Sequence, residues 1–428
     1  MTIYAPLMLG VEGTKLNLLD KISYKEARLI NGYILYGKNF ESVEQLRQLT
    51  KEIQYNRQRQ ELAPALIAVD HEGGRVQRFS KGYFTKLPRA NTIGRIYSHD
   101  KKAGMALCAA AGLVTAAELG SCGINLCLGP SLDLNTNSSN RITYRAYSEE
   151  ADAVISMSSQ VLSALKEHGM AAVGKHFPGF GAAVFDTHSH FPIIEESWDT
   201  MAGSHLRPFK AVIEQRLLPA VMLTHGAYVS MDLKPVAGSS FWLQEVLRQQ
   251  MHYDGVIMTD CMGMVSAKPL GQNYSSRISN CMRAGCDIIL ISYTFNSMYA
   301  IIKKLINDED LTVFFSSSQA ELSKMRLSKL IEQSQSQDYY MNLRETQAYI
   351  QARKELLDCT KKYYAVLEEV TPKKSNTASV TQRILRKQLK PLIKWLTKKP
   401  WLWELSTSVY LIVQRLKIRK KYEAPTKS

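Results

Sequence analysis

The chain is poor in the features of secreted and membrane-spanning proteins. Its seven cysteines are an odd number and include no C-x-x-C pair, which argues against a disulfide framework and a thiolate zinc site. The N-terminal stretch shows no basic region followed by an apolar one, so no secretory signal is expected. No uninterrupted apolar run reaches about 18 residues, so no membrane-spanning helix is expected either. These absences predict a cytoplasmic protein.

Positive charge is concentrated at one end of the chain. The segment 371–428 carries 15 Lys and Arg against two Glu, and so accounts for +13 of the net charge of +15. The other residues, although far more numerous, are nearly neutral. The sequence therefore predicts two modules, a nearly neutral body and a strongly basic tail.

Eight short apolar runs alternate with helical stretches, as in "SVEQLRQLTKEIQYNRQ". Such strands, apolar along their whole length, are typical of a parallel sheet covered on both faces. They predict an α/β fold, a (β/α)8 barrel of the TIM type, with a doubly wound open sheet as the alternative. The eight predicted strands are Ala5–Val11, Gly32–Gly37, Pro64–Asp70, Ile124–Leu128, Ala171–His176, Pro219–His225, Gly255–Asp260 and Asp287–Tyr293.

The composition predicts three parts: a barrel domain over 1–335, a charged helix or connector over 336–370, and a basic, helical tail over 371–428. In the tail, Leu385, Leu389, Leu392 and Leu396 are spaced as on one face of a helix, among many basic residues. The tail also holds three of the five tryptophans. This pattern favours a helix lying on an anionic membrane surface, which would make the protein peripheral on the inner membrane. A solvated tail, a nucleic-acid contact and a docked helix are the alternatives, and no nucleic-acid-binding motif accompanies the charge.

Polar residues end several of the predicted strands: Asp70, Lys175 with His176, His225 and Asp260. In a barrel of parallel strands, catalytic groups gather at the carboxyl ends, where the loops open a shared pocket. Each residue alone could also be a cap or a turn former. Together they predict one site built from the third, fifth, sixth and seventh strands.

The stretch "GKHFPGFGAAVFDTHSH", Gly174 to His190, holds three of the nine histidines. H-E-x-x-H is absent and no cysteine lies nearby, so a metal site is disfavoured. Asp186 lies two residues before His188, and a carboxylate near one ring nitrogen would fix the tautomer and leave the other nitrogen to exchange protons. His188 is therefore the better candidate for a general acid/base, with a loop histidine as the alternative.

Two further stretches supply candidate chemistry. Asp260 ends "GVIMTD", and an aspartate there could attack an anomeric carbon or cap the following helix. "VDHEGGRVQRF" combines Asp70, two glycines and the arginines Arg75 and Arg78, which could bind hydroxyl groups or form an ordinary turn.

These motifs together resemble the cytoplasmic bacterial β-N-acetylhexosaminidases of glycoside hydrolase family 3 that act in peptidoglycan recycling. "AVDHEGGRVQRF" resembles the family's "DQEGGRVQRF", "KHFPGFGAAVFDTH" resembles "KHFPGHGxxxxDSH", and "GVIMTDCMGM" resembles "GVxxSDDLxM". "RITYRAY" matches "VIGxRSF" more loosely. The resemblance runs from about Ala5 to about Glu332 and leaves the tail out.

The resemblance implies a retaining exo-β-N-acetylglucosaminidase that acts on muropeptide fragments without a metal or another cofactor. Asp260 takes the nucleophile position, His188 the acid/base position and Asp186 the position of its partner. The positions that hold N-acetylglucosamine fall on Asp70, Arg78, Arg145, Lys175 and His176. A phosphorylase with the same residues, and an inactive sugar-binding homologue, are the alternatives.

The chain departs from the family pattern at four positions: Phe180 replaces a histidine, His71 replaces a glutamine, and Cys261 and Gly263 follow the nucleophile in place of the usual residues. None of these changes removes a catalytic group.

Overall fold

The computed structural model describes residues 5–16, 24–136, 141–183 and 191–370. The chain divides into two compact units, Met1–Tyr363 and Tyr364–Ser428, and of the second unit only the end of one helix is described. The predicted acid/base pair of Asp186 and His188 and the predicted tail 371–428 lie outside the described residues.

The first unit is built on one sheet of eight parallel strands in the order β11-β9-β7-β6-β3-β2-β1-β12. A parallel bridge between Met258 and Ile288 joins the two end strands, β11 and β12, so that the sheet closes into a barrel. The strands are β1 (Leu7–Gly10), β2 (Ile30–Leu35), β3 (Leu66–Val69), β6 (Leu126–Cys127), β7 (Ala171–Phe177), β9 (Ala220–Leu223), β11 (Val256–Thr259) and β12 (Ile289–Thr294).

Each of the eight predicted apolar runs overlaps one barrel strand, and the predicted (β/α)8 barrel is confirmed. All barrel strands except β12 are buried at every residue, because helices cover their outer faces and packed side chains fill the barrel. Two short pairs lie outside the barrel: the antiparallel β4 (His71–Gly73) and β5 (Val76–Gln77), and the parallel β8 (Ile193–Ile194) and β10 (Ala227–Tyr228).

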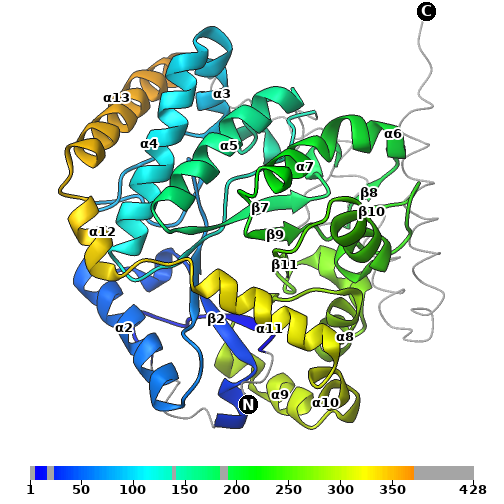
Figure 1. Cartoon of the computed structure of the whole chain (residues 1–428). Coiled ribbons are helices and arrows are strands. Elements are labelled where there is room, and N and C mark those ends of the chain that lie inside the picture. Colours follow the sequence, from blue (N-terminus) through cyan, green and yellow to red (C-terminus); the bar gives the residue numbers. More distant parts are fainter. Residues whose placement is uncertain (1–4, 17–23, 137–140, 184–190, 371–428) are drawn as a thin grey trace, which may run out of the picture. The chain divides into compact units, whose positions relative to one another are not determined.

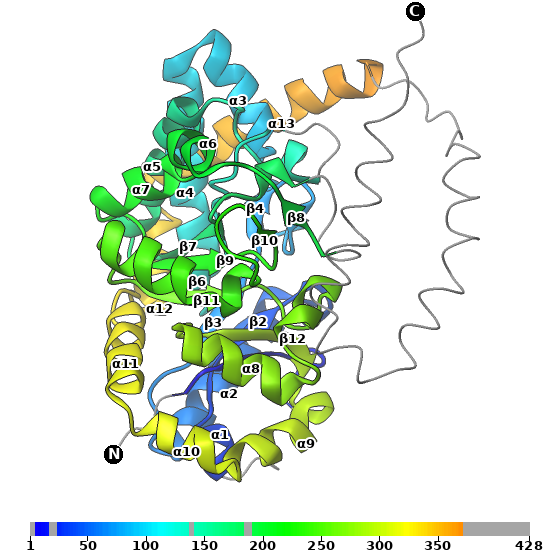
Figure 2. The same cartoon turned by 90° about the vertical axis from the view of Figure 1, so that its right-hand side faces the viewer.

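Helices surround the strands in both views (Figure 1, Figure 2). Helix α2 (Val43–Arg59) shows the sequence logic: Ser42 caps its first turn by accepting from the amide of Gln45, and Leu46, Leu49 and Ile53 are buried at helical spacing. The other helices that flank the barrel are α1 (Tyr24–Ala27), α3 (Ala90–His99), α4 (Lys101–Gly120), α5 (Ala151–Glu167), α6 (Trp198–Thr200), α7 (Arg207–Glu214), the π-helical η7 (Phe241–Gln250), α8 (Tyr274–Ala284), α9 (Phe295–Ile306), α10 (Glu309–Phe315), α11 (Ser318–Ile331), α12 (Gln337–Leu343) and α13 (Gln347–Val370).

Helix α4 is the one helix of the described residues that is long and apolar enough to cross a membrane. Its most apolar stretch is 67% buried inside the protein. At its end, a Cβ on Gly120 would lie 2.3 Å from the ring of Tyr340 in α12, so that glycine allows close helix contact. Its apolar character is therefore explained by packing in the core.

A buried carboxylate on α4 connects that helix to α13. Glu118 is completely buried and accepts hydrogen bonds from the amide and the hydroxyl of Thr85, at 2.7 and 2.6 Å, and from the hydroxyl of Tyr349 at 2.9 Å. Burial raises the pKa of Glu118 to about 7 although these donors oppose the rise.

Candidate active site

The first part of the site is the β4–β5 hairpin, which follows β3. Asp70 lies between β3 and β4, Glu72 lies in β4, and Arg78 follows β5. Gly73 and Gly74 turn the chain with φ of +92° and +58°, a region that favours glycine. A Cβ at Gly73 would also lie 2.2 Å from the carbonyl oxygen of Pro88, so this glycine is needed for the turn and its packing.

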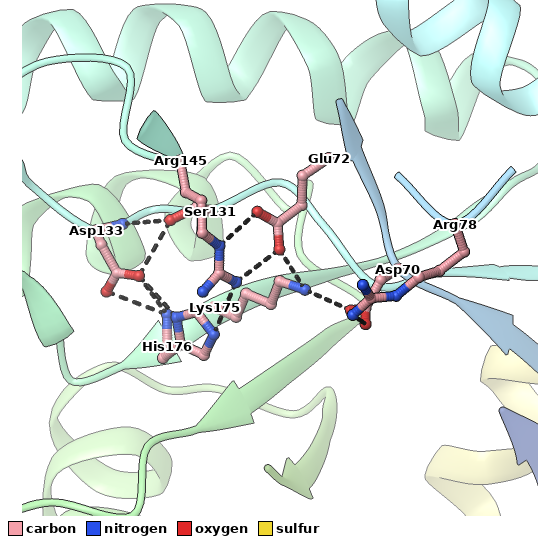
Figure 3. A network of polar contacts seen from close by, with 8 residues as sticks. All are labelled: Asp70, Glu72, Arg78, Ser131, Asp133, Arg145, Lys175 and His176. Carbon is pink, nitrogen blue, oxygen red and sulfur yellow. Dashed lines mark hydrogen bonds and ion pairs between the residues drawn. The ribbon is translucent and has the colours of Figure 1, made fainter. Parts of the chain in front are cut away.

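The second part is the end of β7, where Lys175 and His176 are consecutive and both buried. A regular strand would direct their side chains to opposite faces. Here the pairing with β9 shifts register between Lys175 and Phe177, and the peptide between Lys175 and His176 is cis. Both side chains enter one polar network, which includes the hairpin (Figure 3).

Ion pairs link the hairpin to β7. The carboxylate of Asp70 contacts the guanidinium of Arg78 at 2.6 Å and Nζ of Lys175 at 2.9 Å. Lys175 also contacts Glu72 at 2.6 Å, and Glu72 accepts two hydrogen bonds from Arg145, at 2.8 and 2.7 Å. This two-pronged geometry fixes the plane of the guanidinium.

The network continues from Arg145 to His176 and ends at a buried acid. Nη2 of Arg145 lies 3.2 Å from Nε2 of His176, and Nδ1 of that ring lies 2.7 Å from Asp133. Asp133 is completely buried and accepts further hydrogen bonds from Ser131 and from the amides of His176 and Phe180. An acceptor that is anchored in this way fixes the orientation of the imidazole.

Burial and mutual attraction compete in setting the charges of this network. Burial alone would raise the pKa of Asp70, but Lys175 and Arg78 hold it well below its usual range. Burial opposes ionisation of Glu72 too, yet Arg145 and Lys175 lower its pKa to about 2. Burial would lower the pKa of Lys175, and the two carboxylates raise it instead. The acids are therefore anionic and Lys175 is cationic at neutral pH.

The third part of the site lies at the end of β11. Asp260 follows the strand directly and is partly exposed. Its Oδ1 accepts a hydrogen bond of 2.6 Å from the peptide N–H of Cys261. His225, completely buried after β9, lies with Nε2 at 3.2 Å from the carbonyl oxygen of Cys261.

Tyr36, which follows β2, joins these parts. Its hydroxyl donates to Oγ of Ser292 in β12 at 2.8 Å, and Ser292 donates to Sγ of Cys261 at 2.8 Å. On the other side, the guanidinium of Arg78 lies 5.6 Å from the centre of the Tyr36 ring. Tyr36 thus lies between the Asp70 network and the Asp260 turn, at the carboxyl ends of the strands.

The chain is similar to known proteins over most of this barrel. Residues 20–322 match the model of the glycosyl hydrolase family 3 N-terminal domain. The chain belongs to glycosyl hydrolase family 3. A β-hexosaminidase of Alkalilimnicola ehrlichii is 37% identical over 71% of this chain and 85% of that protein. A β-hexosaminidase of Methylobacillus flagellatus is 40% identical over 67% of this chain and 80% of that protein.

Solved structures show the same fold. NagZ of Neisseria gonorrhoeae in complex with N-trifluoroacetyl-D-glucosamine superimposes with a TM-score of 0.71 and 30% identity, over 83% of this chain and 98% of that one. A β-N-acetylglucosaminidase from Paenibacillus gives a TM-score of 0.67 and 25% identity, over 79% of this chain and 65% of that one. The prediction of a glycoside hydrolase of family 3 is confirmed.

The structure brings the five predicted sugar-binding residues into one network (Figure 3). Asp260 lies at the carboxyl end of β11, which β9 separates from β7 in the sheet. The roles of all these residues, and of Asp186 and His188, stay predictions. Within the described ranges, no group of three or more His, Cys, Asp or Glu is arranged to hold a metal ion.

Sequence reasoning missed two acids of the network, Glu72 and Asp133. Glu72 could have been found, because it lies two residues after Asp70 and so shares a face with it if the chain stays extended. Asp133 lies in an irregular segment after β6, and no pattern in the sequence indicates that it contacts His176.

Two departures from the family pattern are accommodated by packing. The ring of Phe180 lies edge-on to His176, with 6.3 Å between ring centres, and is almost completely buried. His71 is buried inside the hairpin, with its Nε2 3.4 Å from the side-chain Nε2 of Gln77, and burial lowers its pKa to about 3. His71 is therefore neutral and lies apart from the ion pairs.

Proposed function

We propose that the protein is a retaining exo-β-N-acetylglucosaminidase that removes the non-reducing terminal N-acetylglucosamine of β-1,4-linked muropeptide fragments. The observation that carries the proposal is the charged network at the carboxyl ends of β3 and β7, with Asp260 at the carboxyl end of β11 in the same family 3 barrel. It is supported by the similarity to β-hexosaminidases and to NagZ in complex with an N-acylglucosamine. The predicted cytoplasmic location and the role in peptidoglycan recycling belong to the same proposal.

The network is suited to hold a neutral sugar. Carboxylates accept from hydroxyl groups, and guanidinium and ammonium groups donate to them. The side chain of Arg78 is 33% exposed and that of Arg145 is 21% exposed, whereas that of Lys175 is only 2% exposed. We infer that Asp70, Arg78 and Arg145 contact the sugar, and that Lys175 and His176 hold them in place and complete the subsite.

The reaction follows a double displacement. A carboxylate oxygen of Asp260 attacks C1 while the bond from C1 to the leaving oxygen breaks, and His188 gives that oxygen its proton. His188 then takes a proton from water, the water oxygen bonds to C1, and the ester bond to Asp260 breaks. Configuration at C1 is inverted twice and so is retained. Asp186 would orient His188 and stabilise its cationic form.

The test is release of 4-nitrophenol from 4-nitrophenyl N-acetyl-β-D-glucosaminide by the wild type, Asp260→Ala and His188→Ala, with and without EDTA. Turnover that resists EDTA and is abolished by Asp260→Ala supports the proposal. NMR of the first-formed sugar should show the β-anomer. An α-anomer would contradict the retaining mechanism. Absence of turnover by the folded wild type would contradict the proposed activity and favour an inactive sugar-binding homologue.

A phosphorylase is distinguished in the same assay. A histidine acid/base repels an incoming anion less than a carboxylate would, so phosphate could replace water in the second step. Faster turnover with added phosphate, together with formation of N-acetylglucosamine 1-phosphate, would show that the enzyme is a phosphorylase and not a hydrolase.

We also propose the division into a barrel over 1–335, a connector over 336–370 and a basic tail over 371–428 that binds an anionic membrane surface. The support is the charge and tryptophan content of the tail. Co-sedimentation of the full chain with vesicles of phosphatidylglycerol, and not of phosphatidylcholine, would support it. Equal binding after removal of 371–428 would contradict it.

A further inference from the structure

The turn that carries Asp260 has a feature that the reaction above does not use. We propose that Cys261 is a positioning residue for Asp260: its peptide N–H holds one carboxylate oxygen, and its anchored thiol fixes the peptide that carries this N–H. The inference rests on the proposed function, because it assigns a role relative to the nucleophile.

The hydrogen bond to the carboxylate is short and local. The N–H of Cys261 donates to Oδ1 of Asp260 at 2.6 Å. A carboxylate with one oxygen held in this way cannot rotate freely, so its other oxygen is kept in one direction. Attack on C1 needs such alignment, and a misplacement of about 1 Å can cost roughly 100-fold in rate.

The thiol of Cys261 lies at the centre of three donors. Sγ accepts from Oγ of Ser292 at 2.8 Å, from the amide of Ser292 at 3.3 Å and from the amide of Gly263 at 3.3 Å. The hydroxyl of Ser292 is itself oriented by the hydroxyl of Tyr36. The side chain of residue 261 is thus fixed to β12 and to the end of β2, two strands other than its own.

The carbonyl side of the same residue is held by His225. Burial lowers the pKa of His225, so its ring is neutral. Because a carbonyl oxygen can only accept, the contact of 3.2 Å requires the proton on Nε2. Residue 261 is therefore held at three points: its peptide N–H, its thiol and its carbonyl oxygen. A turn that only connected a strand to a loop would not need all three contacts.

This arrangement separates positioning from sugar binding. The charged network from Asp70 to His176 contains no atom of Cys261. Loss of the thiol should therefore lower kcat and leave KM nearly unchanged. A purely structural role predicts a lower melting temperature with normal kcat in the folded fraction.

The experiment compares Cys261→Ala, Cys261→Ser and the control Cys359→Ala, which removes a buried thiol from α13. We expect Cys261→Ala to lower kcat for 4-nitrophenyl N-acetyl-β-D-glucosaminide by about ten- to a hundredfold, with KM within about twofold. Serine should restore most of the activity, because its hydroxyl oxygen accepts from the same donors. The control should equal the wild type. A Cys261→Ala enzyme with wild-type kcat, or an equal loss in Cys261→Ser, would overturn the inference.

Ser292→Ala keeps the test decisive if Cys261→Ala does not fold. It removes the hydroxyl donor to the thiol and should lower kcat in the same direction, by about three- to tenfold. Normal kcat in Ser292→Ala would count against the inference. An inactive wild type would overturn the proposed function together with it, whereas an active wild type with unaffected variants would overturn only the role of Cys261.

Discussion

Replacement of Glu72 by glutamine removes one negative charge from the buried network while the shape of the side chain is kept. The side chains of Glu72 and Lys175 are 4% and 2% exposed, so neither gains much from water. After the replacement, Arg145 and Lys175 lose their shared carboxylate, and an uncompensated charge stays buried. Removing one partner of a buried pair costs about 3–5 kcal/mol in unfolding free energy.

The pKa of Glu72 gives a second estimate of this loss in unfolding free energy. The pKa falls from 4.5 to about 2, and at about 1.4 kcal/mol for each pH unit the charged form gains about 3 kcal/mol on folding. Because the folded-state pKa is the lower one, this stability is complete above about pH 4.5 and is lost as the pH falls toward 2. The loss expected from the broken buried pair and the gain calculated from the pKa are therefore of similar size.

The assay is urea unfolding followed by tryptophan fluorescence at several pH values, with Glu149→Gln as the control. Glu149 is exposed, and its replacement should change the unfolding free energy by less than about 0.5 kcal/mol. Glu72→Gln should lose about 3–5 kcal/mol at pH 7, and the gap to the wild type should narrow below pH 4.5. A loss no larger than that of the control, or a gap independent of pH, would refute the reasoning.

Three further outcomes follow from the structure. Arg78→Met should raise KM about ten- to a hundredfold, because the charged hydrogen bonds of Arg78 are lost. The control Arg95→Met changes an exposed residue and should leave KM unchanged. Equal KM values in the two variants would contradict a contact between Arg78 and the sugar. Cys261 alone of the seven cysteines, all of them described, is only partly buried, but desolvation by its surroundings still raises the pKa of its thiol. N-ethylmaleimide should therefore inactivate the wild type slowly at neutral pH and faster as the pH rises, and should spare Cys261→Ser; inactivation of both would point to another thiol. Burial raises the pKa of Glu118 to about 7, so its contribution is present below about pH 4.5 and is lost as the pH rises through 7. The melting temperature of the wild type relative to Glu118→Gln should therefore fall between pH 4.5 and 7, and parallel curves would refute this.

The barrel could be predicted from the sequence because each strand is a short, apolar segment buried on both faces. Such segments are continuous along the chain, as in "PALIAVD", and a parallel barrel leaves few other arrangements for eight of them. Their carboxyl ends also pointed to Asp70, Lys175 and Asp260, since strand direction alone brings those ends to one face.

The contacts between these residues could not be predicted in the same way. Asp133 meets His176 across 43 positions of sequence, and Cys261 meets Ser292 across 31. These contacts depend on irregular segments after the strands, whose path follows from packing and not from periodicity. The departure at Cys261 was visible in the sequence, but its three donors become apparent only when β11 and β12 lie side by side.

The buried network also limits how the sequence can diverge. Asp70 contacts Arg78 and Lys175, Glu72 contacts Arg145 and Lys175, and Asp133 contacts His176 (Figure 3). Replacement of one partner leaves the other as an uncompensated buried charge, whereas loss of an acid together with its base does not. Related sequences should therefore lose or keep each acid together with a base that it contacts, and a sequence that loses only one of the two should carry a new charge nearby.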